Sequence, residues 1–163
     1  MSPSASTGNV FAPSLKDMAK RIVSTSRIIN APAGAIFDVL ADPTKHPLID
    51  GSGSVKAPRS NPERLSKGAK FSMGMKVGMP YVTRNTVSEF EEGRVIAWHH
   101  FAQFVWRYEF EAVEGGTKVT ESFDYSKPWG VALDMTGMPK SNLESMDKTL
   151  ERLDRLVTTG SAD

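Results

Sequence analysis

Glu121 is the side chain whose place in the sequence points most directly to chemistry. It alternates with Val119 and Phe123 in a strand-like run, so the three share one face of the strand. A carboxylate on an apolar face is unfavourable unless it is paired, hydrated inside a cavity or protonated. We therefore expect Glu121 either to face a ligand or to pair with an internal cation such as Arg27 or Arg84.

Histidine and tyrosine side chains extend this chemistry to proton transfer. Glu121 or His100 could exchange a proton beside an activated carbonyl group. Tyr108 or Tyr125 could hold the oxyanion that develops, so the candidate catalytic residues are Glu121, His100 and Tyr108. His99 and His100 are adjacent in a strand and point to opposite faces, and the chain has no thiols. We therefore expect no metal site and no cofactor.

The pair Gly115-Gly116 predicts the turn of a hairpin and, with it, the register of the two strands that hold most of these groups. If Glu114 pairs with Thr117, four pairs share the inner face: Ala112 with Val119, Phe110 with Glu121, Tyr108 with Phe123, and Trp106 with Tyr125. A turn centred on Ala102 would add two pairs to that face: Trp98 with Trp106, and His100 with Phe104. A slip of one residue there would turn Trp98 and His100 outward.

Further strands and a short helix must position this hairpin. Strands are predicted over residues 21–30, 71–76, 81–90, 94–101 and 104–113, with a last strand after Gly116. In the second of these, Phe71, Met73 and Met75 alternate with polar residues, and they form either ordinary core or the wall of a cavity. A helix begins at Pro32 and ends at Asp42, and the His46-Pro47 pair interrupts the chain again.

The last helix is predicted over residues 139–158. One face carries apolar residues spaced by three or four: Leu143, Met146, Leu150, Leu153 and Val157. We expect this face to pack on the concave side of the sheet. Ser141 and Glu144 have the spacing of a capping box, whereas Pro139 would suit a slightly earlier start, and Gly160 marks the end.

Composition indicates a single domain and argues against nucleic-acid and anionic-membrane partners. The 163 residues, 39% of them hydrophobic, predict a single domain over 21–158, a flexible N-terminal tail over 1–20 and a C-terminal tail over 159–163. The lack of cysteine fits a reducing compartment, so we expect a cytoplasmic protein. A formal charge of +1, with acids and bases interspersed, favours neither nucleic acid nor an anionic membrane, and no apolar run is long enough to span a bilayer.

Several short motifs, taken in order, resemble one family. They are Ile29-Asn30-Ala31-Pro32, the run from Phe37 to Pro43, Val95-Ile96-Ala97-Trp98, Trp106-Arg107-Tyr108, Gly115-Gly116-Thr117 with Val119-Thr120-Glu121, and the run from Thr149 to Leu153. Their order and spacing resemble the START-like helix-grip (SRPBCC) superfamily, in particular its polyketide cyclase/dehydrase and lipid-transport branch. The resemblance implies an α+β helix-grip fold, in which a seven-stranded curved antiparallel sheet wraps around a long C-terminal helix and two short helices follow the first strand. It also implies a deep apolar cavity but no shared reaction.

Two classes of function remain open at this point. The first is binding, with or without transport, of a small hydrophobic ligand such as a lipid, sterol or polyketide. The second is a polyketide aromatase/cyclase or dehydratase that uses a Glu/His/Tyr set; because no acid–base pair has a clear geometry, binding is favoured. We expect a monomer or homodimer with a small hydrophobic partner, no nucleic acid and no membrane insertion. The expected ligand-binding residues are Phe71, Met73, Met75, Trp98, His100, Trp106, Tyr108, Glu121, Phe123, Tyr125, Met146 and Leu150.

Overall fold

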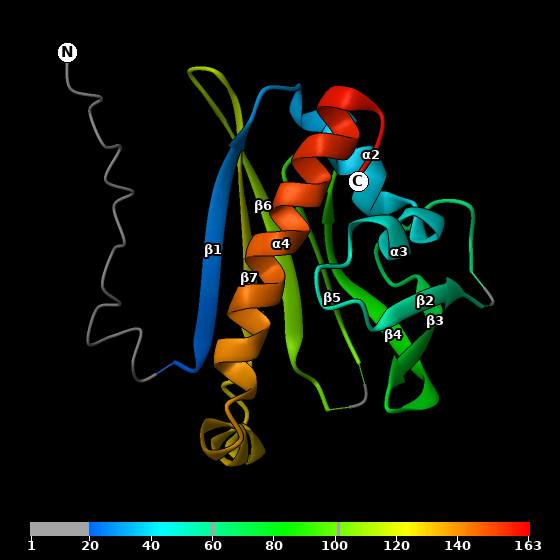
Figure 1. The fold of residues 1–163 in the computed structure, drawn as a ribbon, viewed down its shortest axis with the longest axis vertical. Helices are drawn as coiled ribbons and strands as arrows, with labels where there is room; N and C mark the ends of the chain where they lie inside the picture. The colour runs from blue at the N-terminus through cyan, green and yellow to red at the C-terminus, as the bar shows by residue number, and fades with distance from the viewer. Residues whose placement is uncertain (1–19, 60, 101) are drawn as a thin grey trace.

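The computed structural model describes residues 20–59, 61–100 and 102–163 and has one sheet that curves around one long helix (Figure 1). The strands are β1 (Ile22–Ile29), β2 (Val55–Pro58), β3 (Lys70–Val77), β4 (Met79–Glu91), β5 (Val95–His99), β6 (Val105–Val113) and β7 (Gly116–Asp124). The helices are α2 (Ala33–Ala41), α3 (His46–Ile49) and α4 (Met138–Thr159), with short 3-10 helices η1 (Pro43–Lys45) and η2 (Pro128–Met135). The predicted tail over residues 1–20 lies outside the described residues except for Lys20.

The sheet has the strand order β1-β7-β6-β5-β4-β3-β2, and each neighbouring pair is antiparallel. The predicted helix-grip architecture is therefore confirmed. Strand β2 is the one that pattern reasoning did not locate, since its four residues are too few for alternation to be recognised. No helix among the described residues is long and apolar enough to cross a membrane.

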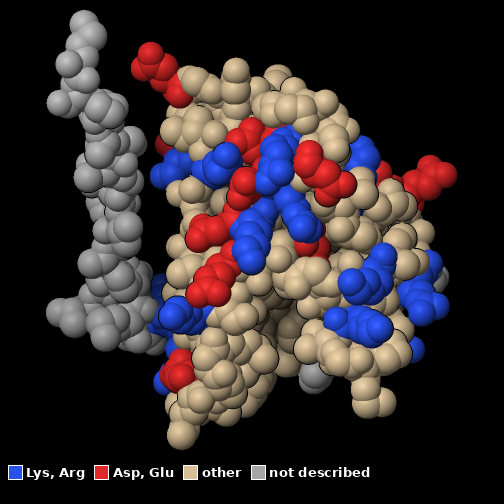
Figure 2. All heavy atoms as spheres, in the orientation of Figure 1, with Lys and Arg blue, Asp and Glu red and all other residues tan. Residues whose placement is uncertain are grey.

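The C-terminal helix α4 packs its apolar stripe into the concave side of the sheet, as predicted. Met146, Leu150 and Leu153 are buried, whereas Leu143 and Val157 are half-buried at the edges of the stripe. The opposite face is charged, and Figure 2 shows acidic and basic side chains gathered along it. On this face Glu151 and Arg155 form an ion pair at 2.6 Å.

The start of α4 corrects one prediction. The helix begins at Met138 after Gly137, with Pro139 in its first turn and no side chain capping its first amides. The capping box at Ser141 and Glu144 is therefore wrong, and the earlier start suggested by Pro139 is right, because proline loses no hydrogen bond in a first turn. The predicted end is confirmed, since Gly160 adopts φ 84° as the C-cap.

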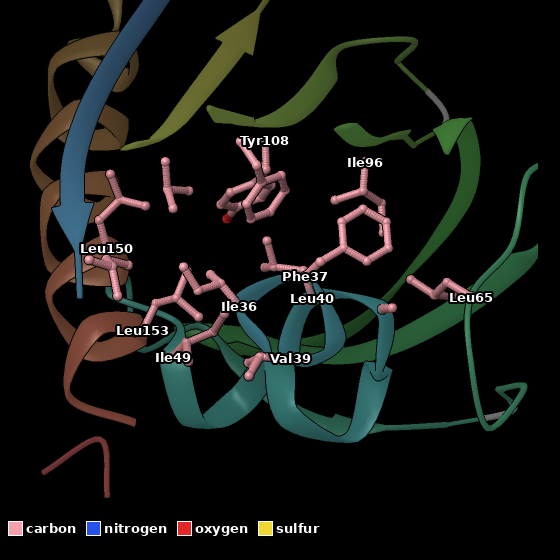
Figure 3. Packing of buried hydrophobic residues seen from close by; sticks show 14 of the residues in the cluster. Ile36, Phe37, Val39, Leu40, Ile49, Leu65, Ile96, Tyr108, Leu150 and Leu153 are labelled. Atoms are coloured by element: carbon pink, nitrogen blue, oxygen red, sulfur yellow. The ribbon is translucent and has the colours of Figure 1, made fainter. Parts of the chain in front are cut away.

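Helix α2 fills one end of the space between the sheet and α4. Figure 3 shows its side chains between Leu150 and Leu153 of α4 and the sheet residues Ile96 and Tyr108. The ring centroid of Phe37 lies 5.1 Å from that of Phe90 and 5.5 Å from that of Phe110. Pro32 precedes the helix, and Asp42 follows it and accepts a hydrogen bond from the Thr44 amide, as the predicted boundaries require. At this end, buried side chains fill the space between the sheet and α4.

The pairing of β6 with β7 differs from the prediction by two residues. Val113 pairs with Gly116, which places Tyr108 opposite Glu121 and Trp106 opposite Phe123. All four predicted pairs are therefore wrong, although every side chain keeps its predicted face: Ala112 with Val119, Phe110 with Glu121, Tyr108 with Phe123, and Trp106 with Tyr125. Gly116 is needed in the strand rather than in the turn, because a Cβ there would lie 2.1 Å from the carbonyl oxygen of Ile29.

The pairing of β5 with β6 confirms the prediction for the tryptophans. Trp98 lies opposite Trp106, and the strand pairing ends one step later at His99 and Val105. Beyond that point, the rings of His100 and Phe104 lie 6.0 Å apart in an edge-to-face contact. The inner face of the sheet therefore presents Trp98, Trp106, Tyr108 and Glu121 as adjacent side chains.

Candidate functional site

A cavity of about 700 Å³ occupies the other end of the space between the sheet, α3 and α4. Figure 2 shows the surface hollowed between the α4 side of the molecule and the lobe formed by β2, β3 and β4. All the expected ligand-binding residues except Tyr125 and Leu150 line this cavity: Phe71, Met73, Met75, Trp98, His100, Trp106, Tyr108, Glu121, Phe123 and Met146. Leu150 belongs to the main core, and Tyr125 is stacked on Phe123 in a smaller buried cluster.

Aromatic rings make up much of the wall. The Trp98 ring stacks on His46 at 5.2 Å between centroids, meets Phe71 edge to face at 5.6 Å and lies 5.6 Å from Tyr108. Further along the sheet, Trp106 lies 4.5 Å from Phe123. Such rings combine large apolar faces with a few polar edges, which suits an apolar ligand that carries few polar groups.

Glu121 lies buried in this wall, with 2% of its surface exposed. The Tyr108 hydroxyl donates a hydrogen bond to Glu121 Oε1 at 2.8 Å, whereas Oε2 has no hydrogen-bond partner in the described part of the chain. Burial raises the pKa of Glu121 from 4.5 to about 8; the bond from Tyr108 opposes this rise, and the negative charges of Asp50 and Asp147 add to it. The carboxyl group is therefore neutral over most of the physiological pH range.

Tyr108 is affected by the same surroundings. Burial raises its pKa well above the usual value for a tyrosine, and the negative charge of Glu121 raises it further. The phenol therefore keeps its proton and acts as a hydrogen-bond donor. The observed register of β6 and β7, which differs by two residues from the predicted one, forms this pair because it places Tyr108 directly opposite Glu121.

The internal cation suggested for Glu121 is not present among the described residues. Arg27 forms its ion pair with Asp154 of α4, at 2.7 Å between Nε and Oδ2 and partly exposed to solvent. Arg84 is exposed on β4, opposite Ser72. The partner of Glu121 is a neutral phenol, so of the two alternatives the buried salt bridge with Arg27 or Arg84 is wrong.

Two histidines face the cavity from different elements. His46 at the start of α3 is buried, and its Nε2 lies 2.8 Å from the Leu40 carbonyl oxygen. Burial lowers the pKa of His46, so its ring is neutral. Burial also lowers the pKa of His100, as does the neighbouring His99. The sequence pattern predicted His46 only as part of a helix-breaking pair with Pro47. Its position in the cavity wall was missed, because the local pattern does not show that η1 directs the side chain toward the sheet.

Sequence reasoning also missed the polar residues that α4 and the loop after α3 contribute. Asn142, Ser145 and Thr149 recur every three or four residues, beside the apolar stripe of α4, and this spacing could have revealed them. The Gly51 amide donates to Thr149 Oγ1 at 2.9 Å, and a Cβ on Gly51 would lie 2.1 Å from the Ser145 carbonyl oxygen. This close approach brings the neighbouring Asp50 to the cavity wall.

Comparison with solved structures agrees with the fold. Protein Ms6760 from Mycobacterium smegmatis superposes with a TM-score of 0.68 at 18% identity, over 85% of this chain and 92% of that one. An AHSA1-like protein from Aeromonas hydrophila gives a TM-score of 0.64 at 18% identity, over 87% of this chain and 95% of that one. At this level of identity the likeness concerns the fold alone.

Comparison with sequences identifies the family. The uncharacterized protein Rv0088 of Mycobacterium tuberculosis (strain H37Rv) is 34% identical in an alignment of 162 residues that covers 95% of this chain and 72% of that protein. The family described as polyketide cyclase / dehydrase and lipid transport matches residues 20–158. The chain therefore belongs to the polyketide cyclase/dehydrase and lipid-transport family of helix-grip proteins.

Proposed function

We propose that this protein binds a small, uncharged hydrophobic molecule in the cavity between the sheet and α4. The observation that carries the proposal is a cavity of about 700 Å³ whose apolar wall contains the buried carboxyl group of Glu121, with an Oε2 that has no hydrogen-bond partner among the described residues. This volume lies within the range of about 300–1,000 Å³ found for small-molecule sites. The aromatic rings and methionines would contact the apolar body, and Glu121 with Tyr108 would orient one polar end.

The charges around the cavity support an uncharged ligand. Among the described residues that line it there is no lysine or arginine, whereas Asp50 and Glu121 are both present. A ligand carboxylate would lose its hydration without finding a cation, which is strongly unfavourable. A hydroxyl or carbonyl group, by contrast, could bond to the free Oε2 of neutral Glu121. Sterols and polyketide-like aromatic molecules fit this description better than free fatty acids.

A matched pair of fluorescent probes tests this proposal. Pyrenedecanol and pyrenedecanoic acid differ only at the terminal group, and we expect saturable binding of the alcohol at least tenfold tighter than that of the acid at neutral pH. Saturable binding of neither probe would contradict the binding function, and equal or tighter binding of the acid would contradict the preference for uncharged ligands. Extraction of the purified protein followed by mass spectrometry would identify a ligand that co-purifies.

Two tryptophan variants on α4 show whether the probe occupies the cavity. Asn142 lines the cavity, whereas Glu144 lies two residues away on the exposed face of the same helix. Asn142→Trp narrows the cavity, so it should lower probe affinity by tenfold or more. Glu144→Trp adds the same side chain to the wet face and should leave affinity unchanged. Equal affinities for the two variants would place the probe elsewhere.

One observation supports catalysis as a second candidate function. A carboxyl group with a pKa of about 8 and a free oxygen can donate a proton at neutral pH and accept one slightly above it. In a cyclase or dehydratase, Glu121 would transfer the proton and Tyr108 would steady the oxyanion. With a poly-β-ketone thioester as substrate, Glu121→Gln should then lower turnover by about 10²–10⁴-fold while pyrenedecanol still binds. A carrier would show no turnover in the wild-type protein.

A further inference from the structure

Exposed apolar side chains gather at the end of the molecule where the cavity opens. The β3–β4 hairpin turns at Gly78 and exposes Val77, Met79, Tyr81 and Val82, with 79% of the Met79 surface accessible. Helix η2 exposes further apolar residues: Trp129, Val131 and Met135. Figure 1 shows the hairpin and η2 at the same, lower end of the molecule. Because Val77 and Tyr81 of the hairpin and Leu133 of η2 also line the cavity, these two segments border its mouth.

A basic groove adjoins the apolar hairpin. It has a volume of about 250 Å³, and its charged lining residues are all cations: Lys56, Arg59 and Lys76. None of the three takes part in an ion pair within the described part of the chain. Met75 and Tyr81 line both this groove and the cavity. Unpaired cations and exposed apolar residues therefore lie side by side next to the mouth.

The net charge of the whole chain is near neutral, but the segment that contains this groove has a large excess of basic residues. Between residues 51 and 88 the only acidic residue is Glu63, whereas the basic ones are Lys56, Arg59, Arg64, Lys67, Lys70, Lys76 and Arg84. Of these, Arg64 is the one with ion pairs inside the described part of the chain, to Asp38 and Glu92. On the face shown in Figure 2, the lobe of β2, β3 and β4 displays lysine and arginine at its lower end without acidic side chains. The balance of acids and bases over the whole chain predicts no attraction to an anionic membrane, because it averages over this basic segment.

We propose that this end of the molecule docks on a lipid bilayer that contains anionic lipids. The hairpin tip around Met79 would enter the interface, and Lys56, Arg59 and Lys76 would contact lipid phosphates. An acidic protein partner would explain the cations but not the apolar residues that project on both sides of the mouth. Tyrosine and tryptophan at the rim, here Tyr81 and Trp129, are the residues that favour the level of the lipid headgroups.

Docking in this orientation goes beyond ligand binding, since it concerns how a ligand reaches the site. The mouth of the cavity would face the bilayer, so a hydrophobic molecule could pass between lipid and protein without crossing water. The inference that this surface serves ligand transfer therefore rests on the proposed binding function. Docking on the bilayer does not rest on that function, because docking is measured with ligand-free protein.

Sedimentation with lipid vesicles tests the proposal. The full chain should bind vesicles of phosphatidylcholine mixed with phosphatidylglycerol, and bind pure phosphatidylcholine vesicles far more weakly. Each cation close to an anionic surface contributes about fivefold to binding. Lys56→Gln with Lys76→Gln should therefore lower the partition coefficient by about 25-fold. Met79→Ser should also weaken binding, by about fivefold or more, because it removes apolar contact with the interface.

Control variants at the opposite end of the molecule match these changes. Lys118→Gln and Ile28→Ser alter a cation and an exposed apolar residue that pair across β1 and β7, far from the hairpin tip. They should leave vesicle binding unchanged. All of these variants should retain affinity for pyrenedecanol, since none of the substituted residues lines the cavity.

Three results would overturn the proposal: no binding to anionic vesicles, equal losses in the control and test variants, or binding that depends on the cations but not on Met79. The last result would indicate a purely electrostatic surface of the kind that suits an acidic protein. Vesicle binding without pyrenedecanol binding would instead remove the proposed function and leave the docking surface standing.

Discussion

The raised pKa of Glu121 should make the stability of this protein fall as the pH rises, over a range in which the stability of most proteins changes little. Below pH 4.5 the carboxyl group is neutral in both the folded and the unfolded chain, so its contribution to stability is complete. Between pH 4.5 and about 8 the unfolded chain releases this proton while the folded chain retains it. Stability is therefore lost as the pH rises through this window.

The magnitude follows from the size of the pKa shift. Each pH unit within the window corresponds to about 1.4 kcal/mol, which amounts to about 3–4 kcal/mol between pH 5 and pH 8. Glu121→Gln keeps the shape of the side chain and removes its titration. The free energy of unfolding of the variant, minus that of the wild type, should therefore increase by this amount between pH 5 and pH 8.

Urea unfolding of ligand-free protein at several pH values measures this difference, because the other titrating groups are common to both proteins and cancel. Glu111→Gln makes the same substitution on the exposed face of β6 and is the matched control. A flat difference for Glu121→Gln would mean that its carboxyl group has an ordinary pKa in the folded protein, and it would refute the effect of burial inferred above.

Three more predictions concern the elements that build the site. Leu150→Ala should cost about 2–5 kcal/mol in denaturant unfolding, because Leu150 is fully buried in the core, and a loss below half a kcal/mol would remove α4 from that core. Tyr108→Phe should lower stability by about 1–3 kcal/mol at neutral pH, and it should raise the pKa of Glu121 above about 8 because the Tyr108 hydrogen bond opposes that rise. Carbon-13 NMR of the labelled Glu121 carboxyl measures this pKa, which would not change if the hydrogen bond were absent. Gly51→Ala should destabilise by about 1–3 kcal/mol, because its methyl group would meet the Ser145 carbonyl oxygen, whereas Gly34→Ala in α2 meets no atom and should stabilise by up to about 1 kcal/mol.

Local pattern was enough to predict the long helix and the inner face of β7. The spacing of Met146, Leu150 and Leu153 predicted which side of α4 is buried, and alternation placed Glu121 on the inner face of its strand. Both properties depend on the geometry of a single element, the period of a helix or of a strand, which any stretch of sequence displays directly. Pro139 and Gly160 likewise marked the ends of α4 through restrictions on their own backbone.

The partner of each side chain was decided only by the tertiary structure. A shift of two residues keeps every side chain on its face, so alternation could not tell whether Phe110 or Tyr108 lies opposite Glu121. The choice depends on Gly116, which the packing of Ile29 requires inside the strand.

The same limit applies to residues that meet across the fold. Arg27 lies on the strand next to β7, yet α4 presents Asp154 to it, so Glu121 is left with a phenol as its partner. His46 reaches Trp98 only because two short helices fold back over the sheet. Contacts between distant segments depend on how elements pack together, and no single stretch of the sequence contains that information.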